Sequence, residues 1–289
     1  MDLPPPPRAL HVAVLGWGAT RLRDLPWRRT RDPWAILVSE LMLQQTQVSR
    51  VLPRYEAFLA RFPTAAVCAD ATAADVVREW NGLGYNRRAL NLHRAATVIA
   101  AGGFPDTLDG LLALPGVGPY TARALLAYAF ERDAAVVDTN VARVLARFHG
   151  HRLTARQAQD AADALLADGH AWAWNQATMD LGAQLCRPRT PRCDECPLQP
   201  WCAWHRAGCP EPDPAIGSAH VSVGQPPFSG SDRQGRGRLV RVLRRGSVPR
   251  SDAAAVMGWP ADPARAERIV AGLIADGLVV QTDGVLHLA

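Results

Sequence analysis

The sequence has no lysine, so arginine supplies all 32 of the basic side chains other than histidine. Without a side-chain amine, the chain cannot form the lysine Schiff base that some lyases use. It also has no apolar run long enough to cross a membrane. Its opening residues, MDLPPPPRAL, lack the charged and then apolar order of a secretory signal peptide. We therefore expect a cytoplasmic protein with no membrane partner.

Alternating strand patterns are missing before Pro210, and there is no solenoid-type repeat. A chain of 289 residues can bury two domain cores and a small third one. The net charge of +5 is modest but compatible with a nucleic-acid partner. Most of the chain is therefore predicted to be all-α.

Helical periodicity is clear from Asp32 onwards. Asp32 and Pro33 form a cap and first turn for a helix over 34–48, with an apolar face and with Glu40 and Gln44 on another face. Further helices are expected over 53–60, 73–80, 87–101, 107–114, 119–130, 140–149, 154–166 and 172–185.

A tight turn at Gly116 and Gly118 precedes a helix that opens at Pro119. Glycine allows positive φ and close backbone approach, and proline suits a first helical position. The free N–H groups of such a turn attract a phosphate, so a helix–hairpin–helix could hold a nucleic-acid backbone without reading its sequence. An ordinary helix connection is the alternative.

Four cysteines follow one another with the spacing C-x6-C-x2-C-x5-C: Cys186, Cys193, Cys196 and Cys202. Four thiolates suit either structural zinc or an iron–sulfur cluster, and the spacing lacks the two separated C-x2-C pairs of a zinc ribbon. The loop between the first two cysteines carries Arg187, Arg189 and Arg192, which we expect to face a phosphate backbone. Cys68 is expected to be buried, and Cys209 has no assigned role.

These motifs together resemble the helix–hairpin–helix DNA glycosylases that carry an iron–sulfur cluster. The segments SELMLQQTQV, WNGLGY, LPGVGPYTARA and VDTNVARV are similar to those of MutY-type adenine DNA glycosylases, over about Leu25 to Cys202. The resemblance implies a [4Fe–4S] cluster on the four cysteines and a two-lobed helical fold. The expected regions are an N-terminal segment (1–24), a six-helix barrel lobe with the hairpin (25–133) and a cluster lobe (134–209).

Carried over to this chain, the resemblance makes Glu40 the catalytic acid and Asp138 the second carboxylate, supported by Tyr120 and Asn140. Adenine leaves readily only after protonation, so an acid with a raised pKa is needed, and burial on an apolar helix would raise the pKa of Glu40. Asp138 begins a helix, whose positive end is expected to keep it ionised. Taken singly, Asp138 could be only a helix cap and Glu40 a surface residue.

The resemblance also implies residues that contact DNA. Gln45 and Leu83 would be wedges that fill the base stack, Gln44 would lie at the DNA, and Tyr85 would contact the base opposite the target. Two positions depart from the usual pattern. Asn86 stands where a second tyrosine is common, and Leu90 replaces an arginine.

The chain changes character after Pro210. A Pro-, Gly- and Ser-rich linker (210–234) leads to a winged-helix-like accessory segment (235–289), with helices near 237–245, 251–257 and 264–276 and a hairpin around the turn TDG. Seven arginines lie between 233 and 250 without an acidic residue. They could form a solvated basic helix or, as we expect, a backbone-binding module that is indifferent to the lesion.

The expected function is a monofunctional DNA glycosylase that removes adenine mispaired with 8-oxoguanine or guanine in double-stranded DNA, acting as a monomer in base excision repair. Tyr120 stands where a glycosylase–lyase would have lysine. The alternatives are a thymine or uracil glycosylase of the same superfamily, or a non-catalytic iron–sulfur DNA-binding protein. Pyrimidines of that kind leave as anions and do not need Glu40, and the presence of both carboxylates argues against a non-catalytic role.

Overall fold

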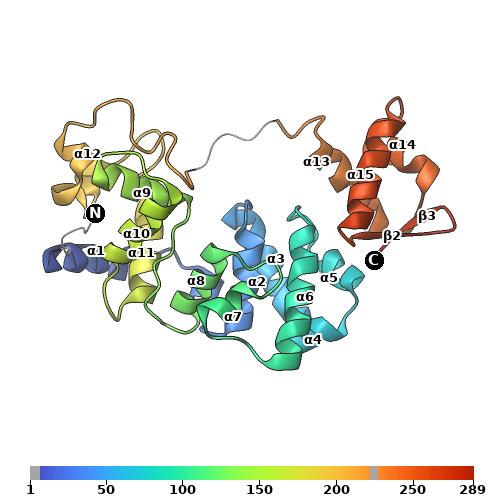
Figure 1. Ribbon diagram of the computed structural model, residues 1–289, viewed down its shortest axis with the longest axis horizontal. Helices are drawn as coiled ribbons and strands as arrows, with labels where there is room; N and C mark the ends of the chain where they lie inside the picture. Colours follow the sequence, from blue (N-terminus) through green and yellow to red (C-terminus); the bar gives the residue numbers. More distant parts are fainter. Residues whose placement is uncertain (1–6, 222–226) are drawn as a thin grey trace. The chain divides into compact units, whose positions relative to one another are not determined.

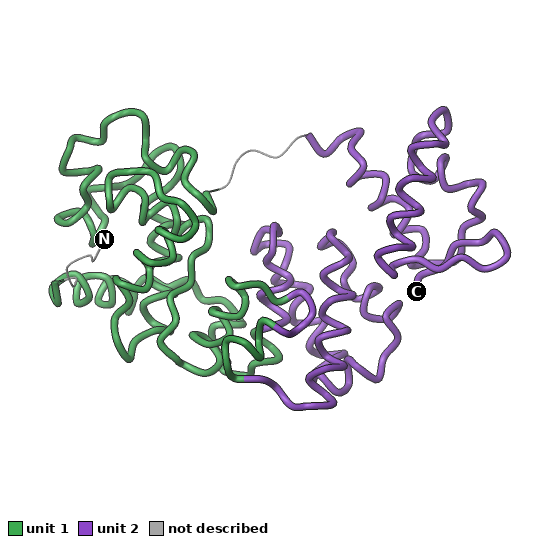
Figure 2. The backbone as a smooth tube through the Cα atoms, viewed as in Figure 1, with its two compact units in different colours: residues 1–36, 106–112, 117–223 green, residues 37–105, 113–116, 224–289 purple. Residues whose placement is uncertain are grey.

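The computed structural model describes residues 7–221 and 227–289 (Figure 1). The chain forms two compact units, one of residues 1–36, 106–112 and 117–223, the other of residues 37–105, 113–116 and 224–289 (Figure 2). Among the described residues, no helix combines the length and apolar character needed to span a membrane.

The first unit is helical and is built around α9 and α11. Buried alanine, valine and leucine side chains of these helices form its core, against which α1 and α10 pack. Its helices are α1 (Arg8–Arg21), α7 (Leu108–Leu112), α8 (Pro119–Tyr128), α9 (Thr139–His149), α10 (Ala155–Leu165), α11 (Ala171–Gln184) and α12 (Ala203–Arg206).

A buried carboxylate ties the segment after α1 to α11. Asp180 accepts hydrogen bonds from Arg28 Nη1 (2.8 Å) and Arg23 Nε (2.8 Å), and its side chain has no exposed surface. Burial raises the pKa of Asp180, but the hydrogen bonds from the two arginines outweigh it and hold this pKa below its usual value. The N-terminal segment is thereby fixed to the first unit.

The helix α2 (Pro33–Leu43) begins in the first unit and continues into the second. Asp32 Oδ1 accepts the N–H of Trp34 (3.1 Å), which confirms the predicted cap. The second unit then contains α3 (Val48–Arg61), α4 (Ala65–Asp70), α5 (Ala73–Glu79) and α6 (Arg87–Gly102). The predicted helix over 34–48 is wrong in length, because α2 ends at Leu43 and a separate loop follows.

The C-terminal part of the second unit has the order helix, strand, helix, helix, strand, strand. Its elements are α13 (Asp232–Leu243), β1 (Val248–Pro249), α14 (Ala253–Met257), α15 (Pro263–Ala275), β2 (Val279–Thr282) and β3 (Val285–Leu288). The antiparallel sheet has the order β1-β3-β2, and Thr282 pairs with Val285 across the predicted turn. Asp283 and Gly284 both have positive φ (50° and 76°), as a tight two-residue hairpin turn requires.

Candidate functional site

Asp138 lies at the N-terminus of α9, in the first unit. Its Oδ1 accepts the backbone N–H groups of Asn140 (2.8 Å) and Val141 (2.7 Å), and its Oδ2 accepts the side-chain amide of Asn140 (2.9 Å). Asp138 is therefore a helix cap, as its sequence position allowed. Because both carboxylate oxygens are held by donors, its orientation is fixed as well.

Arg143 extends this arrangement by one turn of α9. Its Nη2 donates to Asn140 Oδ1 (2.9 Å) and to the Gly182 carbonyl (2.7 Å), and its Nε donates to the Cys186 carbonyl (2.7 Å). The guanidinium is buried, so it links the carboxylate site to the segment that carries the first of the four cysteines.

The pKa of Asp138 depends on burial as well as on the start of the helix. Burial raises the pKa of Asp138 above its usual value, although the donors of Val141 and Asn140 and the charge of Arg143 oppose this change. The expectation that Asp138 stays ionised, which the start of the helix favours, remains a prediction. Desolvation and hydrogen bonding act in opposite directions here, and desolvation is the larger effect.

Two further residues position Asp138, and sequence reasoning missed both. Asn175 of α11 accepts the N–H of Val136 (2.8 Å) and donates to the Ala134 carbonyl (2.9 Å), which fixes the extended segment leading to Asp138. A Cβ at Gly182 would lie 2.7 Å from Asn140 Cβ, so only glycine allows α11 to approach α9 this closely. Their partners are 39–42 residues away in the chain, so no local pattern could have indicated them.

Glu40 lies on α2 in the second unit and is only 5 % exposed. Its neighbours Leu37, Val38, Leu41 and Met42 are fully buried. The alternative of a surface glutamate on a polar helix face is therefore wrong. A buried carboxyl group is the arrangement that the sequence predicts for the proton donor.

Two loops in the second unit carry the residues expected to contact the base stack. Gln45 and Tyr85 both have positive φ, 53° and 45°, which is uncommon for residues other than glycine and is found disproportionately at functional sites. Gln45 is exposed, Gln44 is half-buried and Tyr85 is 41 % exposed. Leu83, by contrast, is 2 % exposed, so a wedge role would require this side chain to leave the core.

Arg88 joins the two loops. Its Nη1 donates to the carbonyls of Leu41 and Met42 (both 2.8 Å), and its Nη2 donates to Thr46 Oγ1 (3.0 Å) and to the Gly84 carbonyl (3.1 Å). It is 7 % exposed, and burial lowers its pKa to about 10, which leaves it charged at neutral pH.

The position of Arg88 explains why sequence reasoning missed it. It lies in the first turn of α6, where the helix dipole disfavours a cation. Its partners are the last carbonyls of α2, where a cation is favoured. An arginine at such an unfavourable position is the one local signal that could have indicated a distant partner.

The two hairpin glycines, Gly116 and Gly118, differ in whether another residue could replace them. Gly116 has φ 81°, and a Cβ there would lie 2.6 Å from Asn91 Cβ. Gly118 caps α8 with extended backbone, and a Cβ added there would meet no atom within 4 Å. Pro119 occupies the first position of α8, as predicted, and Tyr120 follows it, half-buried. Only Gly116 is therefore required by both backbone conformation and space.

The four cysteines border one small, largely apolar cavity in the first unit. Burial raises the pKa of Cys193 to about 11 and that of Cys196 to about 12, so these thiols stay neutral unless a metal binds them. In the described part of the chain, no set of three or more His, Cys, Asp or Glu side chains is arranged around a single metal ion. Four cysteine thiols that line one cavity are a soft donor set, which suits either an iron–sulfur cluster or zinc.

Arg147 anchors the loop that carries the expected phosphate-binding arginines. It is 2 % exposed, forms an ion pair with Asp213 (2.6 Å) and donates to Cys186 Sγ (3.3 Å) and to the Arg187 carbonyl (2.8 Å). Arg187, Arg189 and Arg192 are all exposed, but Arg192 forms an ion pair with Glu195 (2.5 Å).

The two remaining cysteines fall outside the spacing of this ligand set. Cys68 is fully buried, as expected, and burial raises its pKa to about 12. The Cys209 thiol is hydrogen-bonded with that of Cys193, so Cys209 lies beside the cavity although it falls outside the ligand spacing.

Most of the C-terminal arginines make contacts within the chain. Five of the seven have intramolecular partners: Arg233 contacts the Tyr85 hydroxyl (3.4 Å), Arg236 binds Asp276 (2.8 Å), Arg238 the Met257 carbonyl (3.0 Å), Arg250 Glu267 (2.5 Å) and Arg244 residues of α5 and its following loop. The expected backbone-binding module therefore stays a prediction, in which these five side chains would have to share or exchange their present partners.

Comparison with known proteins connects this arrangement to a family. Residues 38–167 match the HhH-GPD superfamily of base excision DNA repair proteins. The chain is 45 % identical to an adenine DNA glycosylase of Mycobacterium tuberculosis over 93 % of this chain and 90 % of that protein. It is 44 % identical to the adenine DNA glycosylase of Mycolicibacterium smegmatis, over 96 % of this chain and 95 % of that protein. A thermostable thymine-DNA glycosylase structure is 30 % identical with a TM-score of 0.63, over 69 % of this chain and 98 % of that one.

Proposed function

Since the chain belongs to the adenine DNA glycosylases of the HhH-GPD superfamily, we propose that it excises adenine paired with 8-oxoguanine or guanine. The observation that carries the proposal is Asp138, which three donors hold at the start of α9. Glu40, which is buried on α2, is proposed as the acid. The higher identity to adenine than to thymine enzymes supports a purine substrate.

The chemistry follows from these two groups. Glu40 donates a proton to a ring nitrogen of the flipped adenine, which makes adenine a neutral leaving group. The bond from the sugar to the base breaks, its electrons leave with the base, and the oxocarbenium-like sugar is stabilised by ionised Asp138. Water then adds to the sugar carbon and loses a proton, which leaves an abasic site in an intact strand.

The reaction is proposed to stop at this abasic site. A lyase step requires an amine that forms an imine with the opened sugar, and the chain has no lysine. Borohydride should therefore trap little or no covalent protein–DNA complex, and the product strand should break only after alkali treatment. Efficient trapping would show that another amine, such as the N-terminus, acts as nucleophile.

Cys186, Cys193, Cys196 and Cys202 are proposed to hold a [4Fe–4S] cluster. When bound, the cluster supplies folding energy for the loop of Arg187 and Arg189. Metal analysis of the purified protein should find iron, and Cys193→Ser should lower the yield of folded protein. One zinc per chain without iron would contradict this assignment.

The decisive assay uses duplexes with adenine opposite 8-oxoguanine, guanine, cytosine or thymine, together with a guanine–thymine mismatch. Adenine release from the first two is expected, and no thymine release. Glu40→Gln should keep DNA binding but slow excision by about 10²–10⁴-fold, the usual contribution of general acid catalysis. Excision by this variant at the wild-type rate would show that Glu40 is not the acid.

A further inference from the structure

Residues 210–221, which lie in the predicted linker, pack on the first unit, and we call them the strap. At its start, the indole N–H of Trp204 donates to the Pro210 carbonyl (2.9 Å), and Trp204 itself lines the cavity of the four cysteines. Near its end, Ser218 Oγ accepts the backbone N–H of Leu153 (3.1 Å), and Ser218 is buried. The strap is therefore bound at both ends to the unit that holds the proposed metal site.

Asp213 is the buried charge in the middle of the strap. Its Oδ2 accepts a hydrogen bond from Arg147 Nη2 (2.6 Å), and both of its carboxylate oxygens lie 3.2 Å from Arg147 Nε. Its Oδ1 also accepts the N–H of Ala215 (2.9 Å). Asp213 is 7 % exposed and Arg147 2 %, and a buried charge that loses its partner is strongly unfavourable. Asp213 therefore fixes the place of the Arg147 guanidinium.

Arg147 carries this restraint to the first of the four cysteines. Its Nη1 donates to Cys186 Sγ (3.3 Å) and to the Arg187 carbonyl (2.8 Å), and its Nη2 donates to the Pro188 carbonyl (3.0 Å). Groups that hold a metal ligand in place contribute strongly to the affinity for the metal. Asp213 thus acts, through Arg147, on the orientation of Cys186 and of the residues that follow it.

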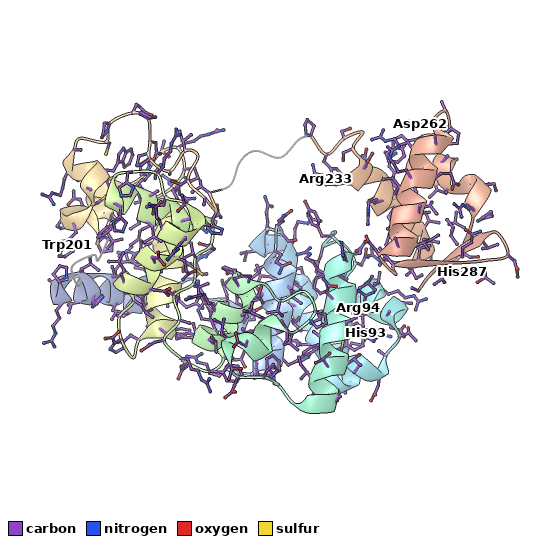
Figure 3. All side chains as sticks on the ribbon, viewed as in Figure 1. His93, Arg94, Trp201, Arg233, Asp262 and His287 are labelled. Atoms are coloured by element: carbon purple, nitrogen blue, oxygen red, sulfur yellow. The ribbon has the colours of Figure 1, made fainter. Side chains whose placement is uncertain are left out.

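The core of the first unit holds other parts of the cysteine loop. Cys196 and Trp201 pack against buried side chains of α9 and α11 (Figure 3). Cys202 Sγ donates to the main-chain carbonyl of Arg147 (3.3 Å), a contact that does not involve the guanidinium. Cys186 is therefore the ligand whose sulfur contacts a side chain that the strap positions.

We propose that the strap controls how readily the proposed metal site opens. Asp213 is a positioning residue that holds Arg147 on Cys186, and Ser218 fastens the end of the strap. Because a metal leaves a closed site only after its ligands move, an intact strap slows metal release. This inference rests on the proposed function, because it takes Cys186 as a ligand of the proposed [4Fe–4S] cluster.

The test uses the full-length protein and compares variants within the strap. Asp213→Asn removes the charge that faces Arg147 and keeps the size of the side chain. Glu211→Gln makes the same chemical change at an exposed position of the strap and is the matched control. Ser218→Ala releases the end of the strap without touching the ion pair, so it tests the proposal even if Asp213→Asn does not fold.

Three quantities are measured for each variant: the rate at which iron passes to a chelator in excess under native conditions, amide hydrogen exchange over residues 186–192, and the midpoint of urea unfolding. Asp180→Asn separates the proposed role from a general loss of stability, because Asp180 is a buried carboxylate of the same unit that binds two other arginines. It should lower the urea midpoint without speeding native iron release.

Iron release should be about 10–100-fold faster in Asp213→Asn, the range found when a group that holds a metal ligand is lost. Ser218→Ala should also release iron faster than wild type, whereas Glu211→Gln should match wild type. Exchange over residues 186–192 should rise in Asp213→Asn and in Ser218→Ala. Wild-type release rates in both of these variants, or rates that simply follow the urea midpoint across the whole set, would overturn the proposal.

Failure of the proposed function gives a different result. Zinc in place of iron would contradict the cluster, while zinc release from the same variants would still test the strap. A wild-type protein that holds neither metal would overturn both. Absence of adenine excision would contradict the proposed activity and leave the metal-release comparison intact.

Discussion

Loss of Arg88 should lower both the stability of the protein and its activity on DNA. It donates to carbonyl groups at the end of α2 and in the loop before Tyr85, and it holds Gln45 and Tyr85 in positive-φ conformations. The replacement Arg88→Met keeps the volume and removes every donor. The buried carbonyl oxygens would then be left without their partner.

The size of the effect follows from two opposing contributions. A buried acceptor that loses its donor costs about 1–3 kcal/mol, so several together would lower the free energy of unfolding by roughly 3–5 kcal/mol. Positive φ at Gln45 and Tyr85 stores about 1–3 kcal/mol at each residue. Trp80 Nε1 also holds the Gly84 carbonyl (3.2 Å), so only about 1 kcal/mol of this strain is released when Arg88 is gone. The net loss should therefore be near the lower end, about 3 kcal/mol.

Urea unfolding measures the lost free energy of unfolding. Excision rates and DNA affinity measure its consequence for function. Arg87→Met is the matched control, because Arg87 is the adjacent residue in α6 and its side chain is 69 % exposed. It should change the stability by less than about 1 kcal/mol. If Arg88→Met is as stable and active as Arg87→Met, the argument that Arg88 organises both loops is refuted.

Three further predictions concern single positions. Asp138→Asn keeps the cap but removes a buried carboxyl group whose pKa is raised by burial, so the melting temperature of the variant at pH 7 should be no lower than that of wild type. Any gain in melting temperature should vanish at acid pH, where the wild-type carboxyl is protonated. Excision by the variant should still be severely impaired. Asp180→Asn should cost about 3–5 kcal/mol of stability, and more than Arg23→Ala. Because the pKa of Asp180 is lowered, that stability should be present above the usual pKa of aspartate and lost as the pH falls below it. Gly116→Ala should destabilise the protein by about 1–3 kcal/mol, whereas Gly118→Ala, with extended backbone and open space, should leave the melting temperature nearly unchanged.

Local signals in the sequence predicted the helices well where caps and apolar periodicity agree. The cap at Asp32, the proline at the start of α8 and the turn at Asp283 and Gly284 were all predicted correctly. The end of α2 was missed, because apolar periodicity continues to Val48 while distant contacts from Arg88 support the break in the helix. A pattern within a segment carries no information about an acceptor more than 40 residues away.

The first helix was missed for a related reason. It contains Gly16 and Gly18, which weaken helical propensity, yet a Cβ at Gly18 would lie 2.8 Å from the Cβ of Ala177 in α11. Close packing of α1 on α11 therefore outweighs the unfavourable local preference. The same kind of long-range requirement explains why the intramolecular partners of the C-terminal arginines were missed: Glu267 and Asp276 lie outside the run of arginines.

Asn86 shows how a departure from a family pattern can be explained by another part of the same chain. From the resemblance alone, the asparagine at this position is only a departure from the family pattern, in which a second tyrosine is common. In the structure its amide oxygen accepts Arg244 Nη2, and the short side chain leaves room for the guanidinium to reach Asn81 and Val77 as well. A bulky ring at this position would compete with the guanidinium for that space. Asn86 and Arg244 therefore form one structural feature, in which the loop next to Tyr85 accepts the C-terminal segment.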